Sequence, residues 1–175
     1  SAAGQTVDLS GGGSNDITGG VTLTGAAVTL GDSSATVIAG ITATGALSVT
    51  SGGAITQSGA IDADSTASFA AGANAITLTN ASNDFSGAVS LSNSGSNDVS
   101  LTDANALDLG TVGVGQNLAI TASGAITDSG VVTVAGTTTF DNSGGSDAAI
   151  DLGSSSTYTG NVTFTTDAGS DVTIT

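Results

Sequence analysis

The sequence lacks lysine, arginine, histidine, cysteine, methionine, tryptophan and proline, and all 15 of its acidic residues are aspartate. With a net charge of −15 and no cationic side chain, it cannot neutralise nucleic-acid phosphates or anionic lipid headgroups. The absence of cysteine excludes a disulfide framework and a thiolate metal site. These absences remove nucleic acid from the expected partners.

Long hydrophobic runs are also missing, since no apolar stretch approaches the ~18 residues of a membrane span. We therefore expect no membrane insertion of this segment. The sequence begins inside a repeat, and neither end has the features of a cap. We interpret it as part of a longer protein with uncapped ends.

A repeat is the main feature that is present. "AITQSG" at 54–59 returns as "AITDSG" at 125–130, an offset of 71 residues (125 − 54 = 71). The same offset lays "ALSVTSGGAIT" at 46–56 over "NLAITASGAIT" at 117–127. A period of this length is typical of repeat architectures. We expect one continuous domain over residues 1–175, with module copies at roughly 1–53, 54–124 and 125–175.

Each module contains a finer rhythm of apolar, polar and apolar residues. The alternation has the period of two that is typical of half-buried β-strands, and Gly, Asn, Asp and Ser separate the triplets. Frequent Gly and β-branched residues disfavour helix, and the regular spacing of aliphatic residues disfavours disorder. Representative triplets have the apolar pairs Val28/Leu30, Leu47/Val49, Ile76/Leu78, Val99/Leu101 and Leu118/Ile120.

Short strands of this kind cannot bury an apolar face alone, but stacked coils of them can. The sequence therefore predicts an all-β parallel β-helix with about three short strands per coil and about 7–8 coils. Val, Ile and Leu should form inward ladders, while Thr and Ser line the surface. On this interpretation one module makes three coils.

Two longer stretches carry a resemblance to a known family. "ANALDLGTVGVGQNLAITASGAITDSGVVTVAGTTTF" and "NDFSGAVSLSNSGSNDVSLTDANALDLG" resemble the repeat region of filamentous-haemagglutinin-like adhesins, which include two-partner secretion exoproteins. The resemblance implies a right-handed β-helix, export across the outer membrane, and an extracellular location on the bacterial cell surface. The Asn-Pro motifs of that family's secretion domain are absent from this segment.

Candidate catalytic residues are few, and we expect no enzyme activity. Hydrolysis by a pair of carboxylates would need two Asp at a defined separation, one of them protonated. The nearest pairs in the sequence are Asp62 with Asp64 and Asp103 with Asp108. We expect Asp62 and Asp64 to point outward, where nothing would hold a proton on either.

Calcium binding deserves separate consideration because Asp, Asn and carbonyl oxygens are the ligands of Ca²⁺. The Asn-Asp pairs that precede strands make Asp16, Asp84 and Asp98 the candidate ligands, and "GGGSNDI" at 11–17 faintly resembles a Ca²⁺-binding repeat. Turn formation by Asn and Asp explains the same residues without a metal. We expect no cofactor and no metal site, with Ca²⁺ as the alternative.

Two surface features could recognise a ligand. Ordered Thr arrays on β-helices can bind ice, but the triplets here fall at different places in the module and are not expected to share a face. Carbohydrate binding favours exposed aromatic residues. The five aromatic residues are expected in the core ladders or at coil corners. The Thr-x-Thr triplets start at residues 22, 42, 77, 137, 163 and 173, and the aromatic residues are Phe69, Phe85, Phe140, Tyr158 and Phe164.

The function that these expectations favour is structural: a β-helical shaft in a large secreted bacterial adhesin or extracellular matrix fibre, supporting cell adhesion and biofilm. Its partners would be neighbouring coils or other copies of itself, with extracellular polysaccharide as a further candidate. The alternatives are a direct binding module for polysaccharide or self-association, and a self-assembling filament or surface-layer subunit.

Overall fold

The computed structural model describes residues 4–10, 15–145 and 148–175, which fold into a stack of short parallel strands. This part of the chain contains no helix long and apolar enough to cross a membrane. The strands are β1 (Val7–Leu9), β2 (Gly20–Gly25), β3 (Val28–Asp32), β4 (Thr36–Ala43), β5 (Leu47–Ser51), β6 (Ile55–Gln57), β7 (Ile61–Ala63), β8 (Ala67–Ala70), β9 (Ile76–Leu78), β10 (Asp84–Phe85), β11 (Val89–Ser92), β12 (Val99–Asp103), β13 (Leu107–Val114), β14 (Leu118–Ala122), β15 (Ile126–Asp128), β16 (Val132–Val134), β17 (Thr138–Asp141), β18 (Ile150–Leu152), β19 (Thr157–Tyr158), β20 (Val162–Thr165) and β21 (Val172–Ile174).

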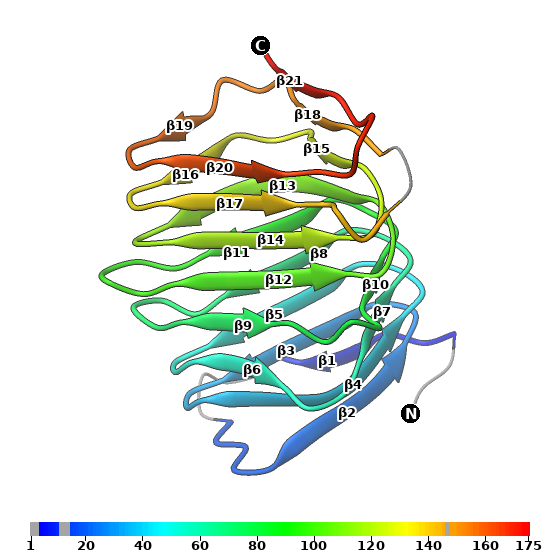
Figure 1. The fold of residues 1–175 in the computed structure, drawn as a ribbon. Coiled ribbons are helices and arrows are strands. Elements are labelled where there is room, and N and C mark those ends of the chain that lie inside the picture. Colours follow the sequence, from blue (N-terminus) through cyan, green and yellow to red (C-terminus); the bar gives the residue numbers. More distant parts are fainter. Residues whose placement is uncertain (1–3, 11–14, 146–147) are drawn as a thin grey trace.

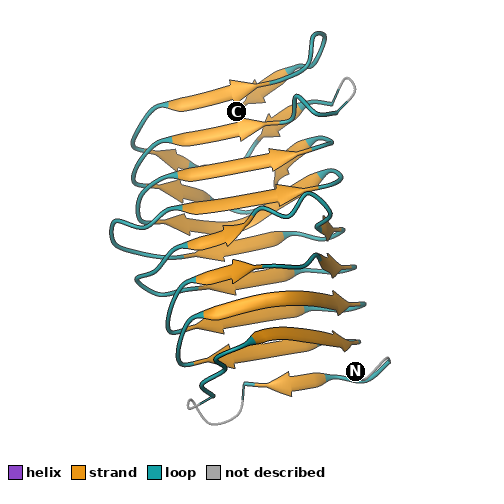
Figure 2. Ribbon diagram, turned by 60° about the horizontal axis from the view of Figure 1, so that its bottom comes forward, coloured by secondary structure: helices purple, strands orange, loops and turns teal. Residues whose placement is uncertain are grey.

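The stack is a right-handed parallel β-helix of about 8 turns, as the sequence predicts. In Figure 1 the front strands run to the right and the rear strands to the left while the chain climbs from the N to the C end. Figure 2 shows the same layered stack from another side. Hydrogen-bond registers divide each turn into three faces. Face I contains the start of β2, the first half of β4, and β6, β9, β12, β14, β17 and β20; face II contains the end of β2, the second half of β4, β7, β10, the first half of β13, β15, β18 and β21; face III contains β1, β3, β5, β8, β11, the second half of β13, β16 and β19.

The three faces merge into two hydrogen-bonded sheets, of 11 and 10 strands, because two long strands cross corners of the coil. β4 pairs with β6 on face I and with β7 on face II. β13 pairs with β15 on face II and with β16 on face III. Face II therefore belongs to one sheet up to β10 and to the other sheet from β13 onward.

The core is a set of aliphatic ladders running along the stack. On face I, Ile55 pairs with Ile76, Ile76 with Val99, and Val99 with Leu118, and all four are at most 1% exposed. Burying one such side chain contributes about 1.5–3 kcal/mol. The inward ladders that the period-two alternation predicts are thus confirmed.

Aromatic side chains fill the larger gaps in this core. Phe69 and Phe85 meet edge to face at 6.1 Å, and both are 1% exposed. Phe140 stacks on Phe164 at 5.6 Å and meets Tyr158 edge to face at 6.1 Å. The core placement expected for the aromatic residues is confirmed for these buried phenylalanines, while Tyr158 and Phe164 are half-buried.

The relation between module and turn differs from the sequence-based expectation. β4 on face I lies 71 residues before its equivalent β13, which starts on face II. The start of β13 is the tenth strand segment after the start of β4, and three segments make a turn. One module therefore spans three and one third turns, and the expectation of three turns is wrong. Each repeat copy sits one face further round the stack than the copy before it.

Glycine allows the corners of successive turns to touch. A Cβ on Gly59 would lie 1.9 Å from the carbonyl oxygen of Ala39 in the turn below, which no side chain can do. A Cβ on its repeat equivalent, Gly130, would also be too close to the turn below, at 2.5 Å from the carbonyl carbon of Gly110. Corner glycines thus set how tightly the turns stack.

Candidate functional surfaces

The outward side of face I is an unbroken row of small and hydroxyl side chains. Successive register pairs connect its members across seven turns without a shift. Thr121 and Thr165 extend a second row beside the first. Asp141, also in this second row, is the one carboxylate at an outward strand position of face I in the described residues. The first row contains Val37, Thr56, Thr77, Ser100, Ala119, Thr139 and Thr163.

The Thr-x-Thr triplets do not share one face, as expected, because those that start at residues 22, 42 and 173 lie on face II. The other three nevertheless converge on face I. Thr77, Thr139 and Thr163 belong to three separate triplets, yet they occupy equivalent outward positions on face I. Their different places in the module are compensated by the shift of one face per module. Whether two triplets share a face therefore depends on how many faces a module advances around the stack, which the spacing in the sequence did not show.

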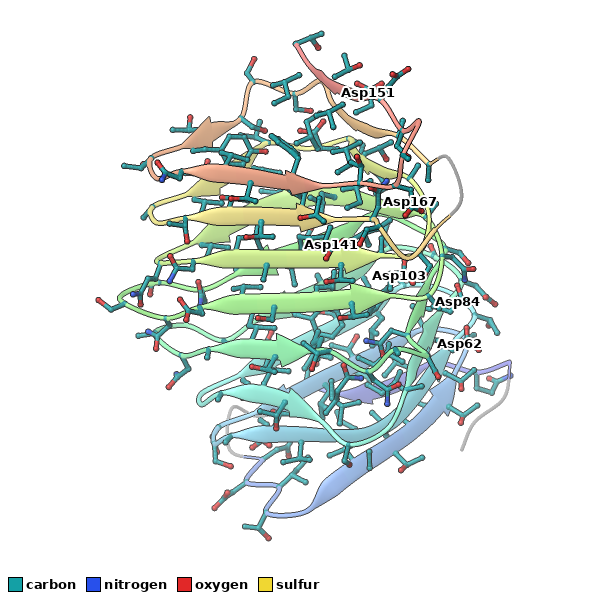
Figure 3. All side chains as sticks on the ribbon, viewed as in Figure 1. Asp62, Asp84, Asp103, Asp141, Asp151 and Asp167 are labelled. Carbon is teal, nitrogen blue, oxygen red and sulfur yellow. The ribbon has the colours of Figure 1, made fainter. Side chains whose placement is uncertain are left out.

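The outward side of face II is acidic. Asp62 and Asp84 are register partners on adjacent strands, and further along the stack Asp108 leads through Thr127 to Asp151. Figure 3 shows Asp62, Asp84 and Asp151 along one edge of the stack. Burial, together with the charges of Asp64 and Asp84, raises the pKa of Asp62. Carboxylates that are scattered in sequence thus collect on one face in space.

The placement of these carboxylates follows the face rather than the place in the repeat. Asp62 and Asp84 on face II are equivalent to Thr133 and Thr157, which lie on face III. Asp108 and Asp151, also on face II, are equivalent to Val37 and Thr77 on face I. In all four pairs the acidic member is the one on face II.

Two further aspartates, Asp32 and Asp103, face inward at corners and are repeat equivalents. Each accepts backbone N–H groups from its own turn and from the turn below: Ser34 and Ile17 donate to Asp32, and Asn105 and Phe85 donate to Asp103. Asp32 is 5% exposed and Asp103 is 1% exposed. The two carboxylates share one kind of backbone environment.

Their second oxygens differ. Thr36 Oγ1 lies 3.4 Å from Asp32 Oδ2 and 3.0 Å from Ser51 Oγ, whereas Asp103 Oδ2 is buried without a hydrogen-bond partner in the described residues. The positions equivalent to Thr36 and Ser51 hold Leu107 and Ala122, which have no hydroxyl.

The pKa values of the two corner aspartates shift in opposite directions. Burial raises the pKa of Asp32, but the hydrogen bonds from Ser34, Ile17 and Thr36 outweigh it and hold the pKa below its usual value. Burial and the nearby charge of Asp84 raise the pKa of Asp103 to about 6, despite its backbone hydrogen bonds. Asp103 is therefore the buried carboxylate in the described chain whose charge is poorly compensated.

A polar cluster lies beside Asp103 at the start of the face II strands. Asn83 is fully buried, and its Oδ1 accepts from Ile61 N at 3.0 Å and from Gln57 Nε2 at 2.8 Å. Its Nδ2 donates to Gln57 Oε1 and to the carbonyl oxygens of Leu78 and Thr102. The amide thereby joins three turns, which is a structural role.

The calcium candidates do not converge. Asp84 lies on face II, whereas Asp16 and Asp98 are exposed outside the strands. Asp98 Oδ1 accepts from Asn117 N and Nδ2, which fits the turn-forming interpretation. In the described ranges no group of three or more acidic side chains could hold a metal ion. Residues 11–14 of the "GGGSNDI" stretch lie outside the described residues.

The two candidate catalytic pairs are separated in different ways. Asp62 and Asp64 are both exposed, as expected from the alternation. The expectation that nothing would favour protonation is wrong for Asp62, because burial and the charges of Asp64 and Asp84 raise its pKa. Asp103 faces inward from β12, whereas Asp108 faces outward from β13, so the structure does not bring this pair together. Sequence reasoning missed Asp103 as an inward-facing group, although the period-two alternation of β12 places it on the same side as Val99 and Leu101 and could have revealed it.

One hollow of about 440 Å³ opens on face III near the N-terminal end. Asn15 crosses it and donates to the carbonyl oxygens of Leu9 and Gly31. Asp32 is its one carboxylate, and the oxygens of Asp32 are already engaged by Ser34 and Thr36. The hollow thus offers a ligand mainly Ser, Thr and backbone groups.

The fold and these surfaces define the class: a β-solenoid repeat protein. A model of repeats of unknown function (DUF5649) matches the chain twice, over residues 25–92 and 96–165, and the chain belongs to this family. The two matches start 71 residues apart (96 − 25 = 71), which is the offset of the module. No curated protein and no solved structure shows significant similarity to the chain.

Proposed function

We propose that this chain is a stretch of β-helical shaft in a large secreted bacterial surface adhesin or extracellular matrix fibre, where it supports adhesion and biofilm. The observation that carries the proposal is the uniform stack. One apolar core runs through about 8 turns, and the strand ladders repeat with few shifts in register. Each turn adds about 4.8 Å of length, so such a stack is suited to reach and stiffness.

Composition and resemblance support the same proposal. The chain has no lysine or arginine at which trypsin could cleave, and no cysteine or methionine that could be oxidised. This composition suits a protein exposed outside the cell. The resemblance of residues 83–140 to filamentous-haemagglutinin-like adhesins favours a place on the bacterial surface. Adhesion itself would then be performed by other parts of the fibre.

A second candidate is a binding module or filament subunit that contacts polysaccharide or another copy directly. The segregation of carboxylates onto face II favours it, because a plain spacer needs no difference between its faces. The two candidates differ in whether the shaft can be shortened without loss of adhesion.

The test is a deletion of residues 55–117, which joins Ala54 to Leu118. Ile55 and Leu118 occupy the same place on face I three turns apart, so the deletion removes whole turns and keeps the faces in phase. Small-angle X-ray scattering of the purified chain should show a rod shorter by about 14 Å.

Adhesion is measured in cells that display the fibre with and without the same deletion. A shaft predicts that adhesion per displayed fibre is unchanged. Loss of adhesion with the fibre still folded and displayed would contradict the shaft and favour the binding module.

A further inference from the structure

We infer that two copies of this rod associate side by side through face I, leaving face II of each copy in water. The inference rests on the proposed function in one respect, because it treats the chain as an extended rod. It adds the partner, which is a second copy of this chain, and the surface that the partner contacts.

Charge restricts how two copies can approach each other. Each carries a net charge of −15 and no cationic side chain, so no ion pair between side chains can form across an interface. Contact is least unfavourable where carboxylates are absent. The seven-residue row from Val37 to Thr163 on face I carries none, whereas the row on face II carries Asp62, Asp84, Asp108 and Asp151.

The distribution of charge is a property of the face and not a by-product of the repeat. Positions that hold Val37 and Thr77 on face I hold Asp108 and Asp151 in the next module, where they lie on face II. A repeat with fixed surface residues would have distributed aspartate over all three faces. The sequence departs from its own repeat to keep the row from Val37 to Thr163 neutral, and Asp141, in the neighbouring row, is the one aspartate at an outward strand position of face I in the described residues.

Face III is less suited to pairing although it is nearly neutral. Its outward row starts at Asp8 and continues through Thr29 to the serines Ser48, Ser68 and Ser90, and the register shifts between Val89 and Leu91. Face I keeps its register and presents Thr methyl groups together with Val37, which is 36% exposed. Its outward row is therefore the more regular of the two.

The available area indicates a weak, reversible contact. A row of seven strands at a spacing of about 4.8 Å, each about 15 Å wide, gives roughly 500 Å² per copy. Two copies would bury roughly 1,000 Å² in total, which is near the lower limit of specific interfaces. Salt should strengthen the association because it screens the repulsion between the acidic rods.

The experiment is sedimentation velocity of the purified chain over a range of concentrations at low and high salt. The face I variant combines Val37→Asp with Thr77→Asp, and the face III control combines Thr133→Asp with Thr157→Asp. Both variants add two charges, and each new aspartate already stands at the equivalent position of another module, so the fold should accept it.

We expect the wild-type chain and the face III control to form a dimer that strengthens with salt. The face I variant should dimerise about tenfold more weakly, or not at all, because like charges would meet across the interface. Its circular dichroism and melting temperature should match those of the control.

Two results would overturn the inference: a wild-type chain that stays monomeric throughout, or a dimer that the face III substitutions weaken and the face I substitutions do not. The frictional ratio separates this failure from failure of the shaft. An elongated monomer contradicts pairing but keeps the rod, whereas a compact or unfolded monomer contradicts both.

Discussion

At the scale of single residues, Asp32 and Asp103 show how one residue type acquires opposite properties at equivalent positions. Both accept a corresponding pair of backbone N–H groups. What differs is the residue four positions downstream: Thr36 donates to the second oxygen of Asp32, whereas the equivalent position after Asp103 holds Leu107, which has no hydroxyl. This neighbour lies only four residues downstream, but the sequence does not show that the chain turns and brings its side chain back to the carboxylate.

Replacing Asp103 with asparagine should stabilise the protein at neutral pH. The folded-state pKa of Asp103, about 6, lies above the usual value of 3.8, so the folded protein holds this proton more tightly than the unfolded chain. The resulting stability is complete below pH ~4 and is lost as pH rises towards 6. An asparagine side chain at this position carries no charge to bury, so D103N should gain about 1–3 kcal/mol at pH 8 and little at pH 4.

Chemical denaturation at the two pH values measures the difference. Asp32→Asn is the matched control, because Asp32 is stabilised in its charged form and its substitution should destabilise the protein at pH 8. An equal effect of D103N at both pH values would show that Asp103 is not the titrating group.

At the scale of elements, the period-two alternation predicted strands and their inward residues well. It did not predict which triplets join. β4 and β13 each carry their ladder across a corner as one strand of 8 residues, because small residues such as Gly40 and Gly110 let the backbone bend there without leaving the sheet. As a result, the strands of face II belong to one sheet up to β10 and to the other sheet from β13 onward.

The hydrogen bonds at the start of β7 and of its equivalent β16 show a second point that the sequence did not predict. Asn83 accepts from Ile61 N and is held by Gln57, while at the equivalent place Ser156 accepts from Val132 N and donates to Asp128. An amide pair and a hydroxyl–carboxylate pair fill the same role. Because the residue types differ, comparing the two module sequences does not show that these residues form equivalent hydrogen bonds.

Gly59→Ala should destabilise the stack because the new methyl group would overlap the carbonyl oxygen of Ala39, 1.9 Å from the Cβ position. Relief requires the two turns to separate locally, at a cost of about 1–3 kcal/mol. Thermal unfolding followed by circular dichroism measures the loss.

Gly113→Ala provides the control for this change, since a Cβ at Gly113 meets nothing within 4 Å. Its melting temperature should stay close to that of the wild-type chain. If both variants melt alike, the corner glycines do not set the spacing of the turns.

At the scale of the whole molecule, the sequence predicted a parallel β-helix from its repeat but not the phase of that repeat. The length of a turn depends on its corners, which vary: Leu47, Ala67 and Val89 are register partners in successive turns although their spacing changes from 20 to 22 residues (67 − 47 = 20; 89 − 67 = 22). No single period in the sequence therefore gives the number of residues in a turn. Without that number, the sequence could not show that the aspartates gather on face II.

Deleting one sequence module, residues 54–124, should therefore rotate the rest of the molecule. β15 and β16 would replace their equivalents β6 and β7 above β4, so the stack should fold and shorten by about 16 Å. Asp151 would move from face II to face I. We expect this variant to lose the association through face I.

The deletion of 55–117 is the comparison, because it removes a similar length but keeps the faces in phase. Small-angle scattering and sedimentation velocity of the two deletions give the lengths and the association. Equal association in both would mean that a module spans whole turns.

The mismatch between ten strand segments and three faces also protects the register of the stack. Turns that lie against each other come from different parts of the module, so some ladder positions pair different residues, as Val49 with Phe69. A slip of one turn would bring different residues together at such positions. Equivalent segments of the two modules sit three and one third turns apart, so they cannot exchange partners with a small movement, and the repeat does not by itself favour a shift of one turn.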